Sequence, residues 1–267
     1  MKKLRYISEY IVFLLIMGLS RVLTVDQASA IGGYIGRSLG PKMKISERAV
    51  KNIKQAFPDL TDEQGQGLIR KMWDNLGRVV FEYPHIRTIA RKRVEFDDKA
   101  HLSEIFEHSE QVIFITAHLG NWEISPLATY EQFNRKMGLV FRAPNNPYIA
   151  KTLQRFRTQS GLLKGFPKSG QGTRELFKAL KNGNGVGILF DQKYNEGKPI
   201  PFFGQDAMTS TAPAELALRF NCPLIPGYVK RTKGVHFEII IGRRIALVTS
   251  KGRQKKPEEI MPDAQEH

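Results

Sequence analysis

The sequence has few of the residues that build disulfides and metal sites. Its single cysteine, Cys222, excludes an intrachain disulfide and is expected to be a small core residue, because it lies beside Pro223 in an apolar stretch. The helical His-Glu-x-x-His spacing of a zinc site is absent, and the histidines form no other ligand pattern. Internal repeats and low-complexity tracts are absent too. With 41% hydrophobic residues, the composition fits a globular enzyme domain.

Acidic residues are scarce beside basic ones. The chain has 26 acidic and 41 basic residues, which gives a formal net charge of +15. A protein this basic is suited to an anionic partner, and nucleic acid, an anionic membrane surface or an acidic protein would all serve. The basic clusters at 2–5, 87–93, 151–157 and 251–256 are dispersed, and no nucleic-acid-binding motif accompanies them. We therefore expect no nucleic acid and favour the other two partners.

Long apolar runs are also missing, and the strongest candidate lies at the N-terminus. A basic stretch, residues 2–5, precedes the apolar segment 10–19, which is shorter than the roughly 20 residues of a membrane span. Extended across its serine borders, the segment could cross a membrane obliquely, or it could lie in the interface. The sequence at 28–30 resembles a signal-peptide cleavage site but is too far from the apolar run. We predict an uncleaved membrane anchor over residues 1–25, with the rest of the chain on the cytoplasmic side.

The most informative segment spans residues 111–123. The apolar residues before His118 are typical of a buried strand, Gly120 permits a tight turn, and Asn121 can cap the helix start that carries Glu123. This pattern predicts an imidazole at the end of a strand, with a carboxylate close enough to orient it. Such a pair is suited to general-base catalysis, although a histidine beside apolar residues is often structural. Because the segment has no serine or cysteine, the proton removed is expected to belong to the substrate.

Two further strand-like segments end in polar residues. Residues 138–141 run into Arg142, and residues 185–190 run into Asp191, with helical patterns between the strands. Alternating strands and helices predict a largely parallel sheet, which binds ligands outside the carboxyl ends of its strands. His118, Arg142 and Asp191 are therefore expected to converge on one cleft.

The segment from His118 to Glu123 resembles the His-x4-Asp/Glu motif of the glycerolipid acyltransferase superfamily. It has the His-x3-Trp-Glu form typical of the lipid A lauroyl/myristoyl acyltransferases. Further segments are similar to motifs of the same family in the same order, namely residues 52–58, 142–147, 191–192, 201–204 and 211–214. The resemblance covers nearly all of residues 1–245.

This resemblance implies a fold and an activity. The implied fold is α/β and glycerol-3-phosphate acyltransferase-like, with a mostly parallel sheet flanked by helices, an N-terminal helical region and a membrane anchor. The implied activity transfers a fatty acyl chain from acyl carrier protein to a hydroxyl of a lipid A precursor, in lipopolysaccharide biosynthesis at the cytoplasmic side of the inner membrane. A basic surface suits both the acidic carrier and anionic lipid, and the chemistry requires neither metal nor organic cofactor. The alternatives are an acyl-CoA-dependent acyltransferase acting on another glycolipid and a non-catalytic membrane-surface binding protein.

The resemblance also assigns roles to the polar residues. His118 would take the proton from the acceptor hydroxyl, while Glu123 would orient the ring and offset its charge. Arg142 is the candidate for binding the oxyanion or an acceptor phosphate, and Asp191 for positioning the acceptor. Two asparagines of these motifs are further candidates for binding substrate: Asn121 and Asn146.

These expectations divide the chain into four parts. Residues 1–25 would form the anchor, 26–95 a helical region, 96–248 the catalytic core, and 249–267 a polar tail that we expect to be disordered. Members of the resembling family continue past a segment like 257–262, so the tail is expected to stop short of the family's usual length.

Overall fold

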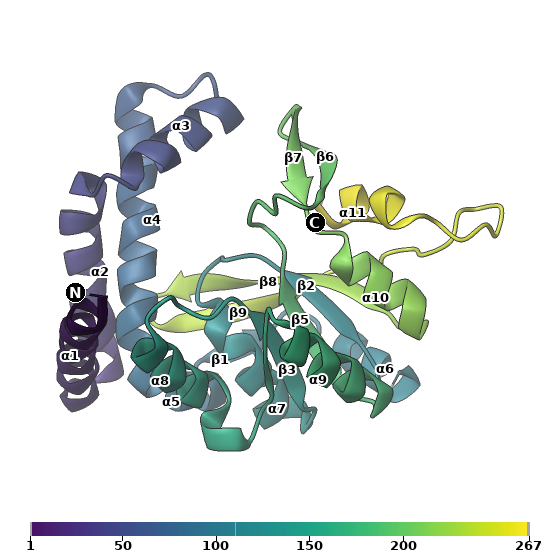
Figure 1. Ribbon diagram of the computed structural model, residues 1–267, viewed down its shortest axis with the longest axis horizontal. Coiled ribbons are helices and arrows are strands. Elements are labelled where there is room, and N and C mark those ends of the chain that lie inside the picture. Colours follow the sequence, from purple (N-terminus) through teal and green to yellow (C-terminus); the bar gives the residue numbers. More distant parts are fainter. Residues whose placement is uncertain (1, 110, 266–267) are drawn as a thin grey trace.

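The computed structural model describes residues 2–109 and 111–265, which form a seven-stranded sheet with helices on both faces (Figure 1). The strand order is β1-β9-β8-β2-β5-β3-β4, and every neighbouring pair is parallel except β8 and β9. The strands are β1 (Val94–Phe96), β2 (Ile113–Thr116), β3 (Met137–Phe141), β4 (Gly165–Pro167), β5 (Gly185–Leu189), β8 (Leu224–Lys233) and β9 (His236–Ile241). The predicted mixed α/β fold with a mostly parallel, helix-flanked sheet is confirmed.

The central strands bury side chains on both faces of the sheet. On β2, Ile113 and Ile115 point into one core and Phe114 toward the other, as the two-residue period of a strand requires. The first core includes residues of α9 (Gly170–Lys181) and α10 (Ala212–Phe220), and the second includes residues of α5 (Ile86–Lys92), α6 (Lys99–His108) and α7 (Ser125–Phe133). Because helices cover both faces of the sheet, a ligand can reach it at the carboxyl ends of the parallel strands.

Helices fill the N-terminal part of the chain. They are α1 (Lys2–Val22), α2 (Val25–Leu39), α3 (Ser46–Ala56) and α4 (Asp62–Glu82), and capping boxes at Thr24 and Thr61 begin α2 and α4. Helices α2 and α4 pack almost backbone to backbone, because a Cβ at Gly77 would lie 2.1 Å from the carbonyl oxygen of Gly32. This contact holds α2 firmly against α4, and the C-terminal end of α4 borders the site described below.

The first helix differs from the predicted spanning anchor. In the described part of the chain, no helix combines the length and the apolar character that crossing a membrane requires. The spanning form of the anchor over residues 1–25 is therefore not supported. Helix α1 instead buries Met17 and Ser20 against the protein and exposes many apolar side chains, including those of Leu4, Val12 and Leu15.

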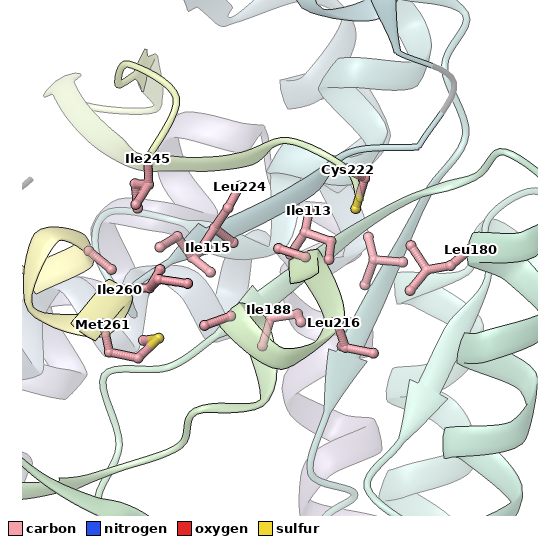
Figure 2. Close-up of a cluster of buried hydrophobic side chains, with 14 of the residues drawn as sticks. Ile113, Ile115, Leu180, Ile188, Leu216, Cys222, Leu224, Ile245, Ile260 and Met261 are labelled. Atoms are coloured by element: carbon pink, nitrogen blue, oxygen red, sulfur yellow. The ribbon is translucent and has the colours of Figure 1, made fainter. Parts of the chain in front are cut away.

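The C-terminal segment is not the disordered tail that its polar composition favoured. Residues Pro257–Gln265 form helix α11, and its Ile260 and Met261 are fully buried. Figure 2 shows these two side chains beside Ile115 and Ile188 in the core formed with α9 and α10. Together with the buried Ala264, these apolar residues anchor a helix that is otherwise polar. The last two residues of the expected tail, 266–267, lie outside the described residues.

A two-stranded hairpin projects from the sheet on the side where the site lies (Figure 1). It consists of β6 (Lys198–Phe202) and β7 (Gln205–Thr209), joined by Phe203 and Gly204, which both have positive φ. Such a two-residue turn matches the twist of a hairpin. The remaining elements are α8 (Pro147–Arg157) and the short 3₁₀ helices η1 (Gly40–Lys42), η2 (Tyr83–His85), η3 (Trp122–Ile124) and η4 (Gln159–Gly161).

Candidate active site

His118 lies just beyond β2 and is held by Asp191, just beyond the neighbouring strand β5. The Nδ1 atom of His118 is 2.7 Å from one carboxylate oxygen of Asp191, and the backbone N–H of His118 donates to the other at 2.9 Å. A carboxylate accepts hydrogen bonds, so Nδ1 carries the proton and Nε2 is left with its lone pair. This is the arrangement of a histidine that acts as a general base through Nε2.

The surroundings of Asp191 favour its ionised form. Partial burial raises its pKa, but hydrogen bonds from the His118 ring and backbone outweigh the burial, so that the pKa lies below its usual value of 3.8. The negative charge can therefore fix the tautomer of His118 and stabilise the imidazolium that forms when the ring accepts a proton. The sequence predicted Asp191 at the site as a residue that positions the acceptor, whereas its hydrogen bonds pair it with His118.

Glu123 does not orient His118 directly, which corrects the prediction from the motif spacing. Its side chain is 2% exposed, and its two oxygens accept hydrogen bonds from Arg157 at 2.8 and 2.6 Å. Trp122 Nε1 donates to the same carboxylate at 3.2 Å, and the Trp122 ring packs edge-on against the His118 ring with centroids 4.8 Å apart. Glu123 is thus linked to His118 only through Trp122 among the described residues, and its carboxylate is bonded to Arg157 of α8.

Arg157 was grouped with the basic clusters of the surface, yet it is mostly buried beside Glu123. Burial lowers its pKa, but the hydrogen bonds and charge of Glu123 outweigh that effect, and the pKa is raised overall. Its Nη1 atom is buried without a hydrogen-bond partner among the described residues. No local spacing rule connects Arg157 with Glu123, which is 34 positions away, so the sequence carried no signal for this pair.

A polar cleft opens on the β3 side of His118. Its volume is about 460 Å³, and its lining includes His118, Glu123, Arg142, Arg157 and Lys168. Arg142 is exposed and forms no ion pair with the residues that the structure describes. Of the three strand ends expected to converge on one cleft, His118 and Arg142 line this one, while Asp191 contacts His118 without being part of its lining.

Asn121 and Asn146, both predicted to bind substrate, are buried and fully engaged within the protein. Asn121 accepts from the backbone N–H of Glu123 at 3.2 Å and donates to Glu82 at 2.8 Å. Asn146 caps helix α8 and donates its amide to the carbonyl oxygen of Tyr6 at 2.8 Å. The motif spacing found these residues, but their role is to hold the turn after β2 and the start of α8.

A buried polar network braces the turn that carries His118. Glu82, at the end of α4, is fully buried and accepts hydrogen bonds from Asn121, Ser29 and both terminal nitrogens of Arg231. Asn75 donates to the carbonyl oxygen of Gly120 at 2.8 Å. The helical region therefore fixes the backbone from which His118 projects.

Two further features bear on the chemistry. A narrow, largely apolar cavity lies between the sheet and α7, and Trp122, Leu139 and Leu189 line both it and the polar cleft. Within the described residues, no three His, Cys, Asp or Glu side chains are placed to hold a metal ion. The arrangement as a whole offers a base, an ionised partner, an unsatisfied donor and an adjoining apolar space.

Comparison with known proteins identifies the family of the chain. No curated protein matches the chain. The model of the family described as bacterial lipid A biosynthesis acyltransferase matches residues 1–259, which include every element of the site. The chain therefore belongs to the bacterial lipid A biosynthesis acyltransferase family.

Proposed function

We propose that the protein transfers a fatty acyl chain from a thioester, carried by acyl carrier protein, to a hydroxyl of a lipid A precursor. The family supports an acyltransferase role in lipid A synthesis. The observation that carries the chemistry is the 2.7 Å contact between His118 Nδ1 and Asp191, which leaves Nε2 as the base.

The reaction needs one proton to move from the acceptor hydroxyl to His118 and from there to the departing sulfur. Nε2 of His118 takes the proton of the acceptor hydroxyl while its oxygen attacks the thioester carbonyl, forming a C–O bond and an oxyanion. Collapse of this intermediate breaks the C–S bond, and the departing sulfur receives the proton from the imidazolium. An ester and a free thiol result, and Asp191 stabilises the imidazolium between the two steps.

Two arginines of the polar cleft are suited to the negative charges of the reaction. Arg157 lines this cleft and is held in place by two hydrogen bonds to Glu123, so its fixed positive charge is suited to stabilising the oxyanion. Arg142 is exposed and able to bind a phosphate on the substrate that enters this cleft. The adjoining apolar cavity, with a volume of about 60 Å³, shares Trp122, Leu139 and Leu189 with the polar cleft and is suited to the first part of an acyl chain.

Transfer of acyl chains to a purified lipid A precursor tests this function. Wild-type protein should transfer acyl groups from acyl carrier protein, and His118→Ala should lower the rate about 10²–10⁴-fold. The preference for the carrier over acyl-CoA should shrink as salt rises, because only the carrier is a large acidic partner. Mass spectrometry of the glycolipid detects the product. A His118→Ala protein as active as the wild type would remove His118 from the mechanism, and equal use of both donors at every salt concentration would favour an acyl-CoA enzyme.

The membrane surface is the proposed place of action, on the cytoplasmic side of the inner membrane. Helix α1 supports this because it exposes apolar side chains next to a basic N-terminus, which suits an interfacial helix on anionic lipid. Replacing the exposed Val12 and Leu15 by Glu should release the protein from anionic vesicles in a flotation assay. The same substitution at the exposed Val248 serves as the control and should leave binding intact. Release by the Val248 variant as well would show that α1 is not the contact.

A further inference from the structure

A second cleft lies on the other side of the His118–Asp191 pair. Its volume is about 990 Å³, with α3 on one side, the β6–β7 hairpin on the other, and the residues after β2 and β5 at its base. Figure 1 shows α3 and the hairpin rising on the same side of the sheet. Asp191 lines this cleft, as do Ala117 and Leu119, the residues on either side of His118. Gln192 lines both this cleft and the polar cleft, so the His118–Asp191 pair lies where the two openings meet, an arrangement suited to two substrates.

The lining of this cleft combines positive charge with exposed apolar surface. Arg48 and Lys51 of α3 and Lys193 after β5 line it, and none of them is paired with an acidic side chain in the described part of the chain. Asp191 and Asp206 also line the cleft, so the basic residues are in excess by one. Leu119, Phe202 and Phe203 also line it and are each about half exposed. Free cations bind anionic groups, and exposed apolar side chains bind hydrocarbon, so the cleft is complementary to an amphipathic anion.

Contacts between α3 and the hairpin bound this cleft. The Phe57 and Phe203 rings pack edge to face with centroids 5.4 Å apart, and Gln55 donates a hydrogen bond to Gln205. These residues join elements that are 150 positions apart in the chain. The two contacts hold the basic face of α3 over the loop that carries Asp191, so Arg48 and Lys51 are positioned to meet a ligand near the base.

We propose that this cleft binds the lipid acceptor, with Arg48 and Lys51 holding a phosphate of its headgroup and the exposed Phe202 and Phe203 contacting its hydrocarbon. The assignment rests on the proposed acyl transfer. It follows from the difference between the two openings, because the cleft with Arg142 is half as large and mostly polar, whereas this one has a mainly apolar lining. The larger opening fits a lipid with several chains, and the polar one fits the arm of a thioester donor.

The test compares acceptors with and without phosphate. Arg48→Gln combined with Lys51→Gln should lower kcat/KM for the phosphorylated acceptor about tenfold or more, because two charge-assisted contacts are lost. The dephosphorylated acceptor cannot use these contacts, so its kcat/KM should change little and the preference for phosphate should largely disappear. The matched control is Lys178→Gln combined with Lys181→Gln, which removes the same charge from the exposed face of α9 and should retain the preference.

Binding to the catalytically inactive His118→Ala protein separates the possible failures. Fluorescence titration with the phosphorylated glycolipid in detergent micelles should show weaker binding when Arg48 and Lys51 are also replaced. A wild-type protein that transfers acyl groups, joined with an unchanged phosphate preference in the double variant, would overturn the cleft assignment alone. A wild-type protein that neither transfers an acyl group to the glycolipid nor hydrolyses the thioester would overturn the proposed function, and the assignment with it.

Discussion

The turn after β2 and the loop after β5 meet at the same site, but the protein holds them very differently. In the turn, Asn121 and Glu123 are buried and bonded to α4 and α8. In the loop, residues 191–196 are exposed, and Asp191 reaches across to His118. The rigid turn sets where the base stands, whereas the exposed loop supplies the charge that the base uses. The carboxylate within the motif, Glu123, therefore stabilises the turn, while the carboxylate that bonds to the His118 ring, Asp191, follows the neighbouring strand β5.

The rigidity of the turn has a backbone origin. Gly120 has φ of +54°, and a Cβ there would lie 2.3 Å from the carbonyl oxygen of Val229 on β8. Only glycine allows this approach, which brings the turn against the sheet and lets Asn75 hold its carbonyl oxygen. Among residues 2–109 and 111–265, the side chain of Asp191 in the loop after β5 is restrained by its two hydrogen bonds with His118. Replacing one residue at a time in the two segments should therefore have different effects.

The largest effect is expected from Asp191→Asn. The amide can donate to the imidazole and favours the wrong tautomer, so kcat should fall about 10²–10⁴-fold while the fold is retained. Steady-state kinetics gives kcat, and circular dichroism checks folding. A variant that keeps near wild-type kcat would show that the contact seen here has no catalytic role.

A smaller effect on rate and a larger one on stability are expected from Glu123→Gln. The substitution removes the charge that pairs with a mostly buried guanidinium, and breaking a buried ion pair costs about 3–5 kcal/mol. The midpoint of urea unfolding should drop, and kcat, measured where the variant is folded, should fall less than in Asp191→Asn. Glu259→Gln is the control, because it breaks the exposed ion pair of Glu259 with Arg253. If Glu123→Gln left the urea midpoint unchanged and lowered kcat as much as His118→Ala does, Glu123 would instead be a direct partner of His118.

The sequence predicted the local features of the site but not the contacts between distant elements. Strand ends are local features, so apolar runs that end in polar residues placed His118, Arg142 and Asp191 in one region. The partners of Glu123 and Asn121 depend on η3, α4 and α8 packing together, and no spacing in the chain records those contacts. The same limit applies to α11, whose few buried apolar residues lie in a polar segment, and to Arg48 and Lys51, which line the cleft because of the position of α3.

The smallest expected effect is a pH dependence of stability, which should distinguish Asp191 from the more deeply buried Glu123. The pKa of Asp191 is lowered in the folded protein by its hydrogen bonds with His118, although partial burial opposes this. The ionised form is therefore favoured by folding, and its contribution to stability is fully present above the ordinary pKa of 3.8 and is lost as pH falls through the lower folded pKa. The difference in unfolding free energy between the wild type and Asp191→Asn, measured by urea titration, should be constant from neutral pH to about pH 4 and should shrink below it. A difference that stays constant well below pH 4 would mean that Asp191 is not stabilised as an anion by His118, and the contrast between the two segments would then rest on burial alone.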